Sequence, residues 1–207
     1  MAKSSYLPVI LFITAVWLCG HFSRHIIGQS AKNSSTENYL FITNRASTAS
    51  KRLHLRSVYS GEVGVREKSG RNDGRRVEEY LVYTGNKKGD PWCASFVCWA
   101  LGKAGIANPR SAWSPDLLPA ERLVWKNRWP LKKEQPHGGD IFGIWFSSKG
   151  RIAHCGFIEV WGTSHVITVE GNTNENGSRD GDGVYRKRRL TRSLYAVADW
   201  LNRKEPK

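Results

Sequence analysis

Cys93 stands where a cysteine could act as a nucleophile. Asp90 and Pro91 precede it, an apolar run over 92–104 surrounds it, and Gly105 follows that run. Asp90 suits an N-cap, Pro91 suits a first helical position and Gly105 suits the left-handed residue after a helix, so the pattern predicts a helix with the cysteine in its first turn. Unpaired N–H groups at a helix start lower a thiol pKa and favour the nucleophilic thiolate. The alternative is that Cys93 is a small buried core residue.

His154 and Glu170 lie in two β-rich runs that are joined by a short connection around Gly162. Such runs predict a hairpin, and a hairpin centred near Gly162 places His154 directly opposite Glu170. Strand alternation then puts Asn172 on the same face. A carboxylate beside an imidazole fixes its tautomer and stabilises the imidazolium, so the pair could serve proton transfer. The alternative is a solvent-exposed His–Glu pair without a catalytic role.

The sequence holds four cysteines and no CxxC pair, which excludes a zinc ribbon and a thioredoxin-like motif. Each cysteine therefore has to be assigned a role on its own. Cys155 follows His154, so alternation predicts that it faces away from His154 and from the helix that carries Cys93. A disulfide between Cys98 and Cys155 is then disfavoured, and Cys98 is expected to be an inert core residue. Residues 61–207 contain three cysteines, so at least one stays unpaired within them, as a working thiol requires.

Several sequence blocks occur in an order that resembles a known family. The block at 89–97 reads Gly-Asp-Pro-Trp-Cys-Ala-Ser-Phe-Val, and its Trp-Cys-Ala-x-Phe-Val part is the most specific. The chain resembles the CHAP family of cysteine, histidine-dependent amidohydrolases/peptidases, within the papain-like superfamily, over about residues 60–190. The other blocks that carry the resemblance are 64–67, 70–74, 77–80, 139–140, 151–157 and 169–173.

The resemblance implies a fold, a reaction and a set of roles. The expected fold is α+β, a papain-like cysteine-peptidase fold with N-terminal helices packed on an antiparallel β-sheet. The expected reaction is cleavage of amide bonds in peptidoglycan, with Cys93 as nucleophile, His154 as general acid/base, Glu170 as the orienting residue and Asn172 as an accessory polar residue. The runs expected to join the sheet are 140–146, 152–160, 166–169 and 194–198.

Other residues could complete such a site. Papain-type relatives often place a Gln shortly before the nucleophile as an oxyanion donor, and Asn86 occupies that stretch here. The candidate oxyanion donors are therefore the backbone N–H of Cys93 and the amide of Asn86. Trp92 and Trp113 are candidates for lining a substrate groove, because a flat ring stacks on sugar faces, although core packing is the default for any tryptophan.

No cofactor or metal is expected. The run that starts at Asn172 alternates like a calcium loop, but amides replace the carboxylates and Gly183 stands where such a loop needs Glu. A zinc site built from His154, Cys155 and His165 lacks a suitable spacing.

The N-terminal part of the chain predicts export. Residues 6–20 are uncharged and apolar, as in a signal-peptide core or a short anchor, so residues 1–22 are assigned to a signal peptide or membrane anchor. Residues 23–57 are polar and basic and predict a spacer. Residues 58–207 then form the CHAP-like catalytic domain. The expected location is periplasmic or elsewhere in the cell envelope, with residues 6–20 as the anchor if this segment is not cleaved.

Composition and charge limit the class of protein and the kinds of binding partner that we expect. The 207 residues include 32 Lys plus Arg and 18 Asp plus Glu, for a net charge of +14, and 40% are apolar. This composition excludes a disordered chain, a collagen and a polytopic membrane protein. The charge favours polyanions, which include an anionic membrane and a cell wall. The basic run 186–189 adjoins no nucleic-acid-binding motif, so we expect a solvated strand edge there and no nucleic-acid partner.

Two functions stay open at this level. The first is an exported peptidoglycan hydrolase, either an N-acetylmuramoyl-L-alanine amidase or a stem or cross-bridge endopeptidase, that acts as a monomer. The second is a catalytically inactive CHAP-like protein that binds the wall or serves as a scaffold. The uncertain second oxyanion donor is the main argument for the inactive alternative.

Overall fold

The computed structural model describes residues 42–43, 45–127, 135–175 and 181–202. The chain divides into two compact units, Met1–Ser47 and Thr48–Lys207. In the first unit the described residues are 42, 43 and 45–47, which are helical. Residues 6–20, where a signal peptide or anchor is expected, lie outside the described residues. Within the described part of the chain, none of the helices combines the length and the apolar character needed to cross a membrane.

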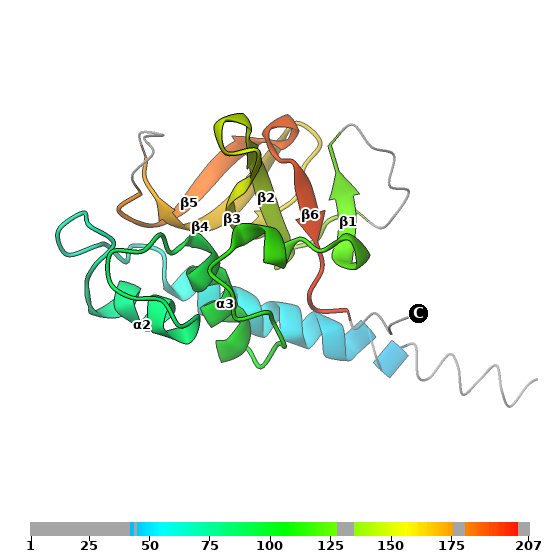
Figure 1. Ribbon diagram of the computed structural model, residues 1–207. Helices are drawn as coiled ribbons and strands as arrows, with labels where there is room; N and C mark the ends of the chain where they lie inside the picture. Colours follow the sequence, from blue (N-terminus) through cyan, green and yellow to red (C-terminus); the bar gives the residue numbers. More distant parts are fainter. Residues whose placement is uncertain (1–41, 44, 128–134, 176–180, 203–207) are drawn as a thin grey trace, which may run out of the picture. The chain divides into compact units, whose positions relative to one another are not determined.

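The second unit is an α+β domain with one antiparallel sheet, as expected, and the sheet has six strands (Figure 1). The strand order is β1-β6-β2-β3-β4-β5. Short 3-10 turns lie at Ser114–Leu117, Ala120–Arg122, Ser147–Lys149 and Thr191–Ser193. The main elements are a helix over 48–61, α2 (Arg75–Tyr83), α3 (Cys93–Lys103), β1 (Leu123–Lys126), β2 (Ile141–Phe146), β3 (Arg151–Val160), β4 (His165–Thr173), β5 (Gly183–Leu190) and β6 (Ala196–Ala198).

The helices cover one face of the sheet (Figure 1). The main core lies between them and includes Tyr59 from the first helix, Phe96 from α3 and Phe157 from β3. The rings of Tyr59 and Phe157 stack with their centroids 4.6 Å apart. A smaller apolar cluster, which includes Phe142 and Ile158, forms on the other face of the sheet. A sheet residue that belongs to the main core lies on the face covered by the helices, and one that belongs to the smaller cluster lies on the other face.

The helix over 48–61 corrects the predicted spacer. Leu55 and Tyr59 are fully buried, and the Arg52 guanidinium reaches Asp140 at 2.7 Å and Asp199 at 3.1 Å. Burial of one such apolar side chain stabilises a fold by about 1.5–3 kcal/mol. The prediction of a spacer over 23–57 was therefore wrong for residues 48–57. The polar composition concealed a single buried stripe, since these side chains recur at helical spacing.

α3 ends where the sequence predicts and begins differently. Gly105 has φ +70°, and the N–H of Ile106 donates to the carbonyl of Leu101. At the other end, Trp92 occupies the N-cap position without a side-chain cap, so the assignment of Asp90 as N-cap was wrong. Asp90 instead accepts from the backbone N–H of Lys87 and closes the preceding loop.

Candidate functional site

The β3–β4 hairpin brings His154 and Glu170 together with a register two residues away from the predicted one. Phe157 pairs with Val169, and continuing this register places Gly156 opposite Glu170. The predicted direct opposition of His154 and Glu170 was therefore wrong. A shift of two residues keeps both side chains on the same face of the sheet. His154 Nε2 and Glu170 Oε2 are 2.8 Å apart.

Glu170 is a fully buried carboxylate whose charge is held by its partners. Both of its oxygens accept hydrogen bonds from the guanidinium of Arg189, and Thr168 donates to Oε1. Burial alone would raise the pKa of Glu170, but the hydrogen bonds from Arg189 and His154 and their charges lower it below its usual range. Glu170 therefore stays ionised beside the imidazole.

Cys93 is the first residue of α3 and faces His154. The residue is 7% exposed, and its thiol lies near enough to His154 for the two groups to shift each other's pKa. A hydrogen bond with Cys155 and, against burial, the hydrogen bond and charge of His154 lower the pKa of Cys93 well below its usual value. Burial alone would lower the pKa of His154, but hydrogen bonds with Cys93 and Glu170 raise it to about 9. Both shifts favour a thiolate beside an imidazolium over the neutral pair.

Cys155 lies against Cys93, which corrects the expectation that it turns away from the helix. It does face away from His154, whose ring lies 6.3 Å from the Phe142 ring on the opposite face. However, α3 covers the face that carries Cys155. His154 itself lies beyond the stretch over which β3 pairs with β4. The Ser114 hydroxyl oxygen lies 3.6 Å from the Cys93 sulfur and 3.7 Å from the Cys155 sulfur.

Asn172 supports the start of α3 instead of facing His154. A register shift follows Glu170, and Asn172 itself has φ +52°. Its side-chain oxygen accepts from the backbone N–H of Trp92 at 3.3 Å, and its amide donates to Asn72 at 2.9 Å. Regular alternation, on which its placement beside His154 relied, does not hold through this bulge. Asn172 therefore ties β4 to the residue that precedes the nucleophile.

The two tryptophans proposed for a groove differ in position. Trp92 is fully buried, and its indole N–H donates to Glu67 at 2.8 Å. Its assignment to a substrate groove was therefore wrong, because a fully enclosed ring offers no surface to a ligand. Trp113 is 48% exposed and directly precedes Ser114, which contacts the nucleophile. The Arg151 guanidinium carbon lies 3.8 Å from the Trp113 ring centroid.

Asn86 is bound within the loop that precedes α3. Its amide N–H donates to Asp90 and its oxygen accepts from Thr84. Both polar ends of the side chain help to order this loop, and its assignment as an oxyanion donor stays a prediction. The backbone N–H of Cys93 remains well placed, because the first N–H groups of a helix have no intrahelical acceptor.

Sequence reasoning missed several contributors to the site. Arg189 sits in the basic run 186–189, which does form an edge strand, β5, as expected. It is not simply solvated, because Arg189 binds Glu170 and Arg186 binds Glu159. Strand alternation places Arg186 and Arg189 on opposite faces of β5, so each face of the strand directs one cation to a buried carboxylate. The role of Ser114 left no signal in the sequence, since it depends on how a loop folds over α3.

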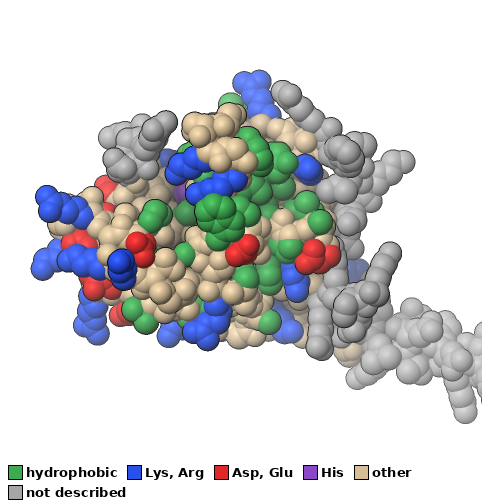
Figure 2. Space-filling view, in the orientation of Figure 1, with side chains coloured by type: hydrophobic (Ala, Val, Ile, Leu, Met, Phe, Trp, Pro, Cys, Tyr) green, Lys and Arg blue, Asp and Glu red, His purple; other side chains and the backbone are tan. Residues whose placement is uncertain are grey.

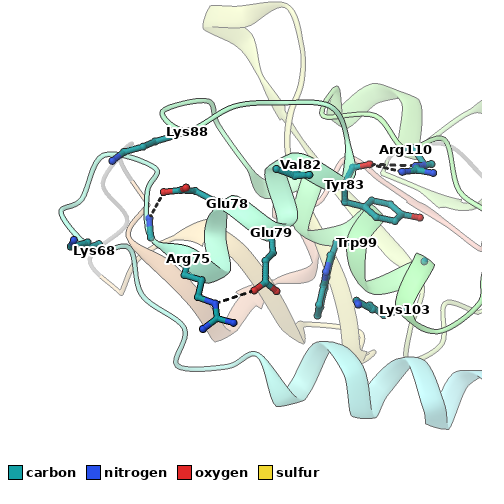
Figure 3. A pocket seen from close by; sticks show the side chains of 12 residues that line it. Lys68, Arg75, Glu78, Glu79, Val82, Tyr83, Lys88, Trp99, Lys103 and Arg110 are labelled. Atoms are coloured by element: carbon teal, nitrogen blue, oxygen red, sulfur yellow. Dashed lines mark hydrogen bonds and ion pairs between the residues drawn. The ribbon is translucent and has the colours of Figure 1, made fainter.

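The surface pocket shown in Figure 3, of about 950 Å³, is separate from this site. It lies beside α2 and the second half of α3, where Trp99, Gly102 and Lys103 line it, whereas Cys93 begins the first turn of that helix. Its charges are mixed, and Arg75 and Glu79 pair with each other across its wall. Among the described residues, Cys93, His154 and Glu170 do not line it.

The described residues place together a buried thiol, an imidazole and a carboxylate in the order that nucleophilic catalysis requires. They contain no group of three or more His, Cys, Asp or Glu side chains that could hold a metal ion. Comparisons with protein-family models, with curated proteins and with solved structures found no match to this chain. The geometry and the motifs therefore carry the functional proposals that follow.

Proposed function

We propose that this chain is a cysteine amidohydrolase/peptidase of the CHAP type, with a papain-like fold, that cleaves amide bonds in peptidoglycan. The observation that carries the proposal is the 2.8 Å contact between His154 and the buried Glu170, with Cys93 at the start of α3 near enough to His154 for each group to shift the pKa of the other toward its charged form. A nucleophile, a base and a group that orients the base are the three parts of a covalent hydrolase site. The motifs around Cys93 and His154 supply the link to the CHAP family.

In the first half of the reaction the Cys93 thiolate attacks the amide carbonyl carbon. The carbonyl π electrons move to oxygen, and the tetrahedral oxyanion accepts a hydrogen bond from the backbone N–H of Cys93. The His154 imidazolium donates its proton to the leaving nitrogen as the carbon–nitrogen bond breaks. The amine departs and the acyl group remains on sulfur as a thioester.

In the second half His154 acts as a base. It takes a proton from a water molecule, which attacks the thioester carbon and releases the carboxylic acid and the thiolate. Glu170 holds one ring nitrogen of His154, so the other nitrogen faces the thiol throughout. Arg189 fixes Glu170 in turn, so the orientation of the imidazole rests on ion pairs buried in the sheet.

Peptidoglycan is supported as the substrate by the surface beside the thiol. Trp113 presents an exposed ring with the Arg151 guanidinium stacked on it, which suits a sugar face next to a carboxylate. The face in Figure 2 carries more Lys and Arg than Asp and Glu, and apolar side chains gather near its centre. A basic exterior favours association with the anionic polymers of a cell wall. Export to the envelope follows from the same proposal.

One observation favours the inactive alternative. The side-chain hydrogen bonds of Asn86 go to Thr84 and Asp90 in the loop before α3 and not to Cys93, so the second oxyanion donor of papain-type relatives is not accounted for. A protein that had lost turnover could still bind the wall through its basic surface. Binding to peptidoglycan without release of product would distinguish this alternative.

The proposal is tested by digesting purified peptidoglycan with the full chain and analysing the products by mass spectrometry. Cys93→Ala is the inactive variant, and Cys98→Ala is the matched control, because Cys98 is a buried cysteine of the same helix. Free stem peptides released by the wild type and the control establish an amidase, whereas cut stems still attached to sugar establish an endopeptidase. Identical digests from the wild type and Cys93→Ala, with both proteins folded, would overturn the proposal.

A further inference from the structure

Cys155 is a buried thiol for which hydrolysis has no use. It lies on β3 one residue after His154, is fully buried, and is near enough to Cys93 for the two thiols to shift each other's pKa. The hydroxyl of Ser114 contacts both sulfurs, at 3.6 and 3.7 Å. Two thiols are thus held side by side on two different elements, one at a helix start and one on a strand. Such a pair can be joined by oxidation.

We propose that Cys93 and Cys155 form a reversible oxidation site, in which hydroperoxides oxidise Cys93 and Cys155 resolves the product as a disulfide. The proposal goes beyond amide hydrolysis and does not require it. Its basis is the Ser114 hydroxyl, which lies within 3.7 Å of both sulfurs, together with the unequal access of the two residues to solvent. Cys93 is 7% exposed, whereas Cys155 is fully enclosed.

The order of the steps follows from this access. Hydrogen peroxide meets the Cys93 thiolate first; the sulfur attacks one peroxide oxygen, the O–O bond breaks, and water and a sulfenic acid form after uptake of one proton. The Cys155 sulfur then attacks the sulfenic sulfur. An S–S bond forms, the S–O bond breaks, and the hydroxyl leaves as water with the proton from Cys155. Cys93 is oxidised by two electrons and the peroxide is reduced by two.

Burial keeps Cys155 suited to the second role. Burial and the neighbouring Cys93 raise the pKa of Cys155 well above its usual value, so it remains a thiol until a sulfenic acid is beside it. Cys98 does not have this position. Its thiol donates to the carbonyl of Ser111, and burial raises its pKa to about 11. Cys98 therefore serves as the internal control.

The experiment treats the reduced full chain with hydrogen peroxide, blocks remaining thiols and maps peptides without reduction. Trypsin places Cys93 and Cys98 on one peptide, 89–103, and Cys155 on another, 152–179. The expected product joins these two peptides with loss of about 2 Da, and dithiothreitol restores both thiols. The same product is expected in Cys98→Ala, which removes the ambiguity about the partner.

In Cys155→Ala and Cys155→Ser, we expect Cys93 to lose its protection against irreversible oxidation. Without a resolving thiol, Cys93 proceeds to a sulfinic acid, about 32 Da heavier, that dithiothreitol does not reverse. We expect the fraction of Cys93 lost irreversibly to rise about tenfold over the wild type. The wild-type map decides the matter even where a variant fails to fold.

Several results would overturn the inference. They are an untouched Cys155 beside oxidised Cys93, a disulfide that uses Cys98 or Cys19, or a Cys93 that peroxide does not modify. Peptidoglycan digestion by the reduced protein is measured separately. A failure of oxidation with normal digestion therefore overturns only this inference, and a disulfide without digestion overturns only the proposed hydrolase.

Discussion

The side chain of Glu170 crosses Gly156 to reach His154. A Cβ atom built at Gly156 would lie 3.0 Å from Glu170 Cγ and 2.8 Å from the carbonyl oxygen of Val169. The strand register places Gly156 across from Glu170, and His154 two residues earlier receives the carboxylate. The absence of a side chain at position 156 is therefore what allows a carboxylate and an imidazole that are not directly opposed to meet at 2.8 Å.

Gly156→Ala should disturb the site from within the sheet. The added methyl collides with Glu170 and with backbone, so we expect a loss of about 1–3 kcal/mol in the free energy of unfolding. We also expect kcat/KM on peptidoglycan to fall by about tenfold or more, because the imidazole loses its orientation. Gly61→Ala is the control, since nothing lies within 4 Å of its Cβ position. Native stability and activity in Gly156→Ala would contradict the claim that the Glu170 side chain passes over Gly156.

Glu170→Gln should shift the pH dependence of turnover. The hydrogen bond and charge of Glu170 help to raise the pKa of His154 to about 9, so the amide should lower that pKa. His154 must be protonated to supply the leaving amine, and kcat/KM falls as pH rises through its pKa. In Glu170→Gln the alkaline limb of the kcat/KM profile should therefore move to lower pH. The variant should keep a reduced but measurable turnover rate.

Glu159→Gln is the matched control for this shift. Glu159 is also a largely buried carboxylate on the sheet, paired with Arg186. Glu159→Gln should lower the free energy of unfolding without moving the alkaline limb of the kcat/KM profile. Equal displacement of the limb in both variants would assign the effect to general electrostatics instead of to contact with His154.

Arg189 acts as a positioning residue through Glu170. Its guanidinium binds both carboxylate oxygens, a geometry that an ammonium group does not reproduce. Arg189→Lys should lower kcat by about tenfold with little change in KM, because the substrate surface is untouched. Arg188→Ala, an exposed neighbour on β5, should leave both constants unchanged. A rise in KM alone for Arg189→Lys would place this residue in substrate binding instead.

Trp113→Ala should weaken substrate binding. The ring is 48% exposed beside the site, so its removal leaves the fold intact and takes away a stacking surface. We expect KM to rise about threefold to tenfold with kcat unchanged, and Trp113→Phe to recover most of the loss. Saturation curves with soluble peptidoglycan fragments measure both constants. Unchanged KM in Trp113→Ala would remove this residue from the groove.

The sequence predicts most of the local structure around the nucleophile. The apolar run and Gly105 define α3, since glycine accepts the φ of +70° at its end. The hairpin is equally predictable from its β-rich runs. These features depend on residues close together in the chain, which is why composition and spacing are sufficient for them.

The errors concern features set by distant contacts. Alternation predicts that Cys155 and His154 face opposite ways, but it does not say which face α3 covers. A bulge after Glu170 turns Asn172 toward Trp92, and a bulge depends on the neighbouring strand. Ser114 reaches both thiols through a loop whose path has no local pattern.

The central claim is that Cys93 is a thiolate held by His154, and alkylation of Cys93 against pH tests it most directly. Iodoacetamide modification of the Cys98→Ala protein, followed on peptide 89–103, gives the pKa of Cys93 without any substrate. We expect a pKa well below the ordinary thiol value of about 8.5, and in His154→Ala a return toward that value. A Cys93 that titrates near about 8.5 both with and without His154 would contradict the claim.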